Sequence, residues 1–303
     1  GGHPSVFKDK NPNVAPDALY KALLRSVEPK GLIAFKSPDG INWTPMSQEP
    51  VITDGAFDSQ NLAFWDSESG EYRAYWRYFT EEDANKINTL YPEMPDHMQR
   101  DLIRIRAIRT ARSKDMINWY DQKDLVYEDS PTNVHLYTNQ INPYYRAPHI
   151  FIGFPNRYIN RGWSESMRVL PELEHRKLRS AASERLGTAI TDGIFMASRD
   201  GVLFKRWNES FLRPGIERKG TWNYGHQAIG CSVVETKSSI EGAPNELSLY
   251  ALESYWTGTK CAMRRYTLRI DGFVSVNAPM RGGELVTKLL IFNGNNLILN
   301  FSS

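Results

Sequence analysis

The chain has 303 residues, of which 41% are hydrophobic and 24% are charged, and its formal net charge is +2. This near balance gives no electrostatic case for nucleic acid, and no apolar run approaches the roughly 20 residues that a membrane-spanning helix needs. Two cysteines, Cys231 and Cys261, are too few for a disulfide scaffold or a metal site, although their neighbouring predicted strands leave one bridge open. We expect no metal and no cofactor.

The first half of the chain is predicted to be mostly strands. Residues 19–24 read as a strand or a short helix, and residues 31–36 read as a strand. Residues 62–78 form a β-hairpin around the turn at 67–70. Residues 103–110 form the next strand. The intervening segment 81–101, with two prolines, is a long loop with helical turns, which either shapes a site or only decorates a connection.

The second half continues with strands around one polar insertion. A strand at 149–154 is followed by a predicted helical insertion at 156–186, and a further strand occupies 193–198. The last full unit spans 224–270. We assign residues 1–280 to one β-domain and 281–303 to a terminal hairpin, which has a strong Asn293-Gly294 turn signal.

One motif recurs between these strands. Ser37-Pro38-Asp39-Gly40-Ile41-Asn42-Trp43 returns as Ser113-Lys114-Asp115-Met116-Ile117-Asn118-Trp119. A looser copy opens at Ser198-Arg199-Asp200-Gly201, with Trp207 as its aromatic, and a degraded copy covers residues 269–273. The copies begin at Ser37, Ser113 and Ser198, so the motif recurs after 76 and then 85 residues. A motif that recurs at such intervals between strands is typical of a radially repeated all-β fold, so we predict a β-propeller.

The repeated motif has the chemistry of a structural turn. Ser and Asp side chains can accept hydrogen bonds from backbone N–H groups of their own turn, Gly supplies a positive φ, and the aromatic anchors the hairpin in apolar packing. We therefore interpret Asp39, Asp115 and Asp200 as structural residues, with a site role as the less favoured alternative. The motif resembles the Asp-box of sialidases, which lies away from their substrate.

The propeller hypothesis predicts where a site lies. Residues at the start of each innermost strand converge on the central axis. This rule selects three segments, at 58–61, 145–149 and 222–227, which supply a carboxylate, a guanidinium, two imidazoles, amides and aromatics. Such a lining suits a sugar. The expected substrate-binding residues are Gln60, Asn61, Arg146, His149, Trp222, Tyr224 and His226.

Glycoside hydrolysis normally needs two carboxylates that flank the bond. We expect Asp58 to be one of them, although it could instead cap a turn through Asn61. Glu253 and Asp192 are the candidates for the second. Glu253 could instead pair with Arg264 or Arg265 across a hairpin, which is the slightly favoured interpretation, and Asp192, which precedes a glycine, could be an ordinary turn residue.

Several stretches resemble bacterial proteins labelled glycosyl hydrolase family 32-like. They are the first copy of the motif, Phe57-Asp58-Ser59-Gln60-Asn61-Leu62-Ala63-Phe64-Trp65-Asp66, and Arg146-Ala147-Pro148-His149-Ile150-Phe151-Ile152-Gly153-Phe154-Pro155. Thr191-Asp192-Gly193 and residues 246–250 extend the likeness over nearly the whole chain. It implies the five-bladed propeller of glycosidase families 32, 43 and 68, and glycan hydrolysis by analogy.

Two departures from family 32 concern its acids. Arg146-Ala147-Pro148 stands where the family has Arg-Asp-Pro, and Asn11-Pro12-Asn13 lacks the acid of the family's N-terminal nucleophile motif. The likeness also leads us to expect a further blade before the first motif, and a β-sandwich that opens at 282–288. The terminal hairpin then either closes the propeller or begins that sandwich.

We therefore predict a glycoside hydrolase-like protein that acts on an oligo- or polysaccharide. The alternative is a non-catalytic carbohydrate-binding propeller, with a pocket of aromatics and amides but only one carboxylate. A third interpretation, a protein-interaction propeller, predicts no axial pocket. A leader removed before Gly1 would place the protein in the periplasm or outside the cell, and the sequence assigns no oligomeric state.

Overall fold

The computed structural model describes residues 5–82, 84–128, 134–255, 257, 261–297 and 299. The chain divides into two compact units. Unit 1 holds residues 1–232 and 249–265, and unit 2 holds residues 233–248 and 266–303. The described residues form mainly antiparallel sheets with a few helices, which confirms the all-β class.

Two four-stranded antiparallel sheets open unit 1. The first has the order β1-β2-β3-β4, with β1 (Ser5–Lys8), β2 (Tyr20–Ser26), β3 (Gly31–Ser37) and β4 (Thr44–Pro45). A short 3-10 turn, η1 (Pro16–Ala18), precedes β2. The second sheet has the order β5-β6-β7-β8, with β5 (Leu62–Asp66), β6 (Glu71–Phe79), β7 (Arg106–Ser113) and β8 (Trp119–Asp124). The predicted hairpin at 62–78 is confirmed.

The third sheet has seven strands. Its main path is β10-β13-β14-β12-β11, and β15 pairs with β14 and, in parallel, with β9. The strands are β9 (Val126–Tyr127), β10 (His135–Leu136), β11 (Asn142–Tyr144), β12 (Ala147–Gly153), β13 (Asn156–Asn160), β14 (Ala189–Ser198) and β15 (Leu203–Leu212). The short β11 was not expected, because Pro143 argues against a strand in the sequence. In the structure the register of β11 with β12 shifts between Pro143 and Tyr144.

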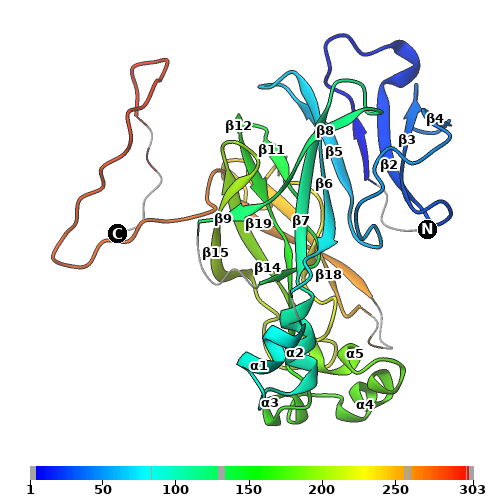
Figure 1. Cartoon of the computed structure of the whole chain (residues 1–303). Coiled ribbons are helices and arrows are strands. Elements are labelled where there is room, and N and C mark those ends of the chain that lie inside the picture. The colour runs from blue at the N-terminus through cyan, green and yellow to red at the C-terminus, as the bar shows by residue number, and fades with distance from the viewer. Residues whose placement is uncertain are drawn as a thin grey trace. The chain divides into compact units, whose positions relative to one another are not determined.

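The helices of unit 1 gather at one end of its sheets (Figure 1). Helices α1 (Ala84–Leu90) and α2 (Asp96–Ile103) confirm the helical insertion at 81–101. The second insertion was predicted in part wrongly, because residues 156–160 form β13. Its helices come later, as α3 (Glu165–Arg168), α4 (Leu173–Ala182) and α5 (Arg185–Thr188).

The fourth sheet has the order β16-β18-β17, with β19 paired to β18. Its strands are β16 (Ala228–Ile229), β17 (Val234–Thr236), β18 (Glu246–Glu253) and β19 (Ala262–Arg269). In unit 2, β17 pairs with residues 246–248 of β18. The described residues after β19 form no helix or strand, and residues 298 and 300–303 lie outside the described part, so the terminal hairpin stays a prediction.

The core of unit 1 lies between neighbouring sheets. One buried cluster joins Leu23 and Leu32 of the first sheet to Trp76 of the second. Another joins Leu62 of the second sheet to Ile194 of the third. Packing sheet faces against each other is how a propeller buries its strands, so this arrangement agrees with the predicted architecture.

The repeated motif closes the turn between the last two strands of a sheet. The Ser37 hydroxyl accepts the N–H of Gly40 at 2.9 Å. Asp39 Oδ1 accepts the N–H groups of Ile41 and Asn42, each at 2.8 Å. The backbone hydrogen bond from Asn42, followed by that from Ile41, lowers the pKa of the Asp39 carboxyl. The structural interpretation of the motif is therefore confirmed for this copy.

The second and third copies repeat these bonds. Asp115 Oδ1 accepts two backbone N–H groups at 2.8 Å, and Asp200 Oδ1 does the same. The aromatic of the third copy was predicted wrongly. Phe204, fully buried, stands six residues after Ser198, the spacing of the tryptophans in the other copies, whereas the Trp207 ring packs on Phe195 with centroids 5.2 Å apart.

The second copy places a methionine where the first has a glycine. Met116 has φ 70°, and Gly40 at the same position has φ 77°. A left-handed backbone is strained for a residue with a Cβ. The Met116 side chain is fully buried in the first core cluster, so its apolar packing offsets that strain.

We predict that Asp115→Ala lowers the free energy of unfolding by about 1 kcal/mol, because two backbone N–H groups lose their acceptor. Chemical denaturation of the full chain measures the change. Asp124→Ala is the control in the same sheet, since Asp124 is a half-exposed acid whose carboxylate pairs with the Arg109 side chain. Equal stability of Asp115→Ala and the parent would contradict the structural role.

Candidate functional site

A pocket of about 280 Å³ lies within unit 1. Its walls come from the segments before β5 and β11, from β13 and β14, and from the chain around β16 and β18. The lining residues are Gln60, Tyr137, Thr138, Gln140, Asn156, Thr191, Tyr224, Gly225, Ala228, Ile229, Gly230, Cys231, Tyr250, Ala251, Leu252, Tyr255 and Met263.

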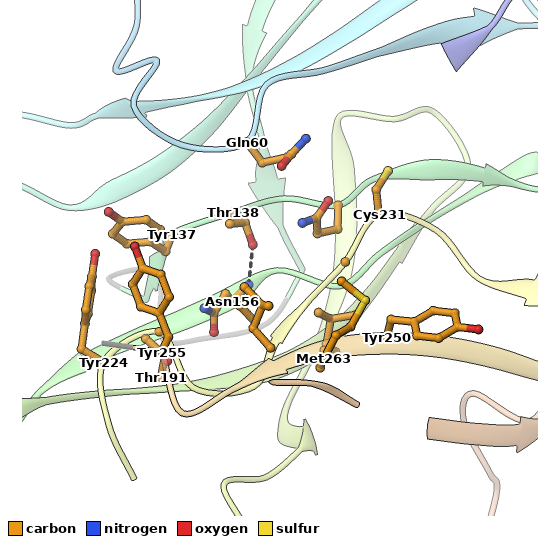
Figure 2. A pocket seen from close by; sticks show the side chains of 17 residues that line it. Gln60, Tyr137, Thr138, Asn156, Thr191, Tyr224, Cys231, Tyr250, Tyr255 and Met263 are labelled. Atoms are coloured by element: carbon orange, nitrogen blue, oxygen red, sulfur yellow. Dashed lines mark hydrogen bonds between the residues drawn. The ribbon is translucent and has the colours of Figure 1, made fainter. Parts of the chain in front are cut away.

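The lining is largely apolar with interspersed amides and hydroxyls, and it carries no carboxylate, guanidinium, ammonium or imidazole among the residues that the structure describes. Figure 2 shows the rings of Tyr137, Tyr224 and Tyr255 together on one side, with Gln60 reaching in from a separate segment. The backbone N–H of Asn156 donates to Thr138 Oγ1 at 3.0 Å. A ligand would therefore meet aromatic faces and aliphatic side chains such as Ile229 and Leu252, together with a few amides and hydroxyls.

Three tyrosine rings form a continuous aromatic wall. The centroid of Tyr224 lies 5.7 Å from that of Tyr137 and 6.4 Å from that of Tyr255. Burial raises the pKa of Tyr224, and the neighbouring Tyr137 adds to this effect. Burial acts in the same direction on Tyr137, but a hydrogen bond with Tyr224 and the charge of Arg77 outweigh it and lower the pKa of that phenol.

Residues just before three strands line the pocket, as the rule applied to the sequence leads us to expect. Gln60 lies two residues before β5, Gln140 two residues before β11, and Tyr224 four residues before β16. The segment before β11 that lines the pocket covers residues 137–140, whereas the sequence placed the middle segment at 145–149. The difference arises from β11, an unexpected strand that comes just before β12 in the chain and pairs with it.

Arg146 and His149 consequently lie elsewhere. Arg146 is in the turn between β11 and β12, His149 is in β12, both are exposed, and neither lines the pocket. Their role in substrate binding stays a prediction without support from this pocket.

Asp58 lies beside the pocket rather than in it. Its carboxylate pairs with Arg77, which is 2% exposed, and the side chain of Asp58 remains 54% exposed. The Arg77 guanidinium lies 4.8 Å from the centre of the Tyr137 ring, which does line the pocket. The turn cap considered as the alternative for Asp58 does not involve its carboxylate, since the Asn61 amide donates to the carbonyls of Phe57 and Ser59.

The other two acids are held by arginines. Arg264 Nε donates to Glu253 Oε1 at 2.7 Å, which confirms the pairing considered for Glu253. Arg157 Nε donates to Asp192 Oδ1 at 2.9 Å, and the Ser210 hydroxyl also donates to this carboxylate. Asp192 is inside β14 and not in a turn, and it is the register partner of Arg157, while its neighbour Thr191 lines the pocket.

Two further expected binding residues make structural contacts. Trp222 Nε1 donates to the carbonyl of Gly215 at 2.9 Å. His226 is 1% exposed, and its Nδ1 accepts the backbone N–H of Ser254 at 3.2 Å. Of the seven expected binding residues, only Gln60 and Tyr224 line the pocket as the structure describes it.

The described residues contain no cluster of three His, Cys, Asp or Glu side chains that could hold a metal ion. Their helices include none long and apolar enough to cross a membrane. Cys231 and Cys261 are both free thiols, so the bridge that the sequence left open is not formed.

No family model and no curated protein matches this sequence. Among solved structures, a complex of BT0996 with RGII has a TM-score of 0.50 at 12% identity, over 92% of this chain and 72% of that one. The Bombyx mori GH32 beta-fructofuranosidase BmSUC1 has a TM-score of 0.50 at 9% identity, over 90% of this chain and 47% of its own.

These likenesses show the fold. The chain shares its fold with this GH32 enzyme and with BT0996, as its resemblance to family 32-like proteins led us to expect. It spans about half the length of that enzyme.

We predict that the free energy of unfolding falls as pH is lowered from about 6.5, the ordinary histidine pKa, toward 5. Burial lowers the pKa of His226 and of His135. The unfolded chain therefore binds protons in this range that the folded chain does not. Denaturation at several pH values should show a shallower dependence for His226→Gln. The exposed His149→Gln controls for loss of an imidazole, and an unchanged slope in His226→Gln contradicts the prediction.

Proposed function

We propose that this glycoside hydrolase-like protein binds an oligo- or polysaccharide in the pocket of unit 1. The observation that carries the proposal is the lining, which combines the tyrosine wall with amides and hydroxyls and, over the described residues, contains no charged group. Sugar rings present C–H faces to aromatics, and their hydroxyls both donate and accept hydrogen bonds. An amide side chain can likewise both donate and accept hydrogen bonds, and the described lining of the pocket has three of them, Gln60, Gln140 and Asn156.

The size of the pocket limits what it holds. Its volume of about 280 Å³ is at the lower end for small-molecule sites, which typically have about 300–1,000 Å³. We infer that it takes one sugar residue of a longer chain, with the neighbouring residues outside. The four described sheets are, in this proposal, blades of a five-bladed propeller.

Gln60→Ala should weaken glycan binding roughly fivefold, because one hydrogen bond to an uncharged group contributes about 1 kcal/mol. A glycan array identifies a bound saccharide, and calorimetry then measures its affinity for the variant. Gln122→Ala removes an exposed amide from β8 as the matched control. Equal affinities of Gln60→Ala and the parent contradict binding in this pocket.

Hydrolysis is the second candidate function, and the position of Asp58 favours it. This carboxylate is partly exposed and paired to the arginine that lies over Tyr137, so it borders the pocket. In a glycosidase one carboxyl protonates the leaving oxygen, and a second activates water or attacks the sugar. Glu253 or Asp192 would supply the second group, and either must first leave its arginine.

If the protein is a hydrolase, Asp58→Asn should reduce the release of new reducing ends by about 10²-fold or more while glycan binding persists. Asp54→Asn is the control, since Asp54 is also an exposed acid paired to an arginine. A saccharide that binds but is never cleaved by the parent contradicts hydrolysis and leaves carbohydrate binding as the function.

A further inference from the structure

A second cavity, of about 370 Å³, also lies in unit 1, and its lining is rich in charged side chains, unlike that of the first pocket. Four arginines line it, Arg100, Arg104, Arg106 and Arg185, against the two acids Asp101 and Glu184. Four positive and two negative side chains leave a formal charge of +2 in the lining. The remaining walls include the rings of Phe79 and Tyr158.

Three of these guanidinium groups rest on aromatic faces. Arg104 lies 4.2 Å from the centre of the Phe79 ring, and Arg106 lies 4.0 Å from that of Tyr158. Arg185 lies 5.1 Å from the centre of the Tyr224 ring. When a guanidinium stacks on an aromatic ring, the contact uses the face of the guanidinium. Its N–H groups point outward from its edge and can still donate to a ligand.

Some of those N–H groups are buried without an acceptor. Arg106 Nε and Arg185 Nη1 have no hydrogen-bond partner within the described ranges. Arg106 Nη1 meets His135 Nδ1 at 3.0 Å, and burial lowers the pKa of His135, which favours the neutral ring as acceptor. A buried donor without a partner costs free energy, which a ligand with acceptor oxygens would recover.

Glu184 neutralises these arginines poorly, since it is exposed and approaches the exposed Arg100 at 4.0 Å. Burial lowers the pKa of Arg106, and the positive charge of Arg77 acts in the same direction, while the charge of Asp101 opposes both. The cluster therefore holds positive charge that an anion would relieve.

The arginine-lined cavity, called the basic cavity below, adjoins the pocket proposed to bind a saccharide, called the sugar pocket. The tyrosine wall connects the two. Arg185 contacts the ring of Tyr224, which lines the sugar pocket. Tyr158 lines the basic cavity, its ring centroid is 6.2 Å from that of Tyr224, and its register partner in β14 is Thr191 of the sugar pocket.

We propose that this cavity binds the carboxylate or sulfate group of an acidic saccharide, another residue of which occupies the sugar pocket. The inference rests on the proposed function and narrows the ligand to anionic glycans. Guanidinium groups bind both oxyanions through paired N–H donors, so the cavity chemistry is shared by uronic acids and sulfate esters.

The test compares neutral, uronic acid-containing and sulfated oligosaccharides by calorimetry. Arg104→Met and Arg185→Met each remove one charge while keeping an apolar stem, and Arg168→Met does so at an exposed position of α3. We expect the first two variants to lose about tenfold or more in affinity for the acidic saccharides and less than about twofold for neutral ones. Added salt should weaken only the acidic ligands.

A second arm uses inorganic sulfate, followed through the arginine Nε–H resonances of the full chain. A shift at Arg106 or Arg185, absent from Arg185→Met, supports the anion site. Equal affinity for neutral and acidic saccharides in all variants overturns the inference and leaves the proposed function intact. Failure of every saccharide to bind overturns the proposed function, and the sulfate arm then decides whether the cavity binds anions at all. Thermal unfolding verifies that each variant is folded.

Discussion

The turns that close the outer hairpins depend on one interaction, the acceptance of backbone N–H groups by an aspartate and a serine. It connects β3 to β4, β7 to β8 and β14 to β15, and so sets which residues face each other along those strands. Ser113 pairs with Tyr72 at one end of the second sheet, whereas Leu62 pairs with Tyr75 toward the other end. Within the second sheet, the turn after Ser113 and the start of β5 after Gln60 therefore lie at different points along β6.

The pocket has no charged side chain in its described lining, because the nearby carboxylates pair with arginines outside it. Asp58, Asp192 and Glu253 each neighbour a segment that lines the pocket, yet each is paired with an arginine outside the lining. Because a buried unpaired carboxylate is costly, pairing is the stable arrangement. What faces the pocket is then an uncharged surface of rings and aliphatic side chains with a few amides and hydroxyls.

The sequence was informative where local patterns decide the structure. Alternation and turn residues predicted the hairpin at 62–78, and the spacing of Ser, Asp and an aromatic predicted the repeated turn. Gln60 and Tyr224 followed from the rule that places a site at the start of first strands. These features depend on residues close together in the chain, so no knowledge of the tertiary structure was needed.

Features set by pairing across the fold were missed. Pro143 concealed β11, so the sequence did not select residues 137–140, the segment that precedes this strand and lines the pocket. The pairs of Arg77 with Asp58 and of Arg157 with Asp192 join different strands or loops, and sequence separation does not reveal them. The second cavity could not be predicted from the sequence for the same reason, since it is formed by three separate elements that carry Phe79, Arg106 and Arg185.

The most direct measurement is a crystal structure of the full chain with a saccharide chosen by the glycan array. The account predicts a sugar ring between the tyrosine wall and Gln60, hydrogen-bonded to the lining amides, with any acidic group directed at Arg106 and Arg185. A saccharide bound elsewhere, with the pocket holding only water, would contradict it.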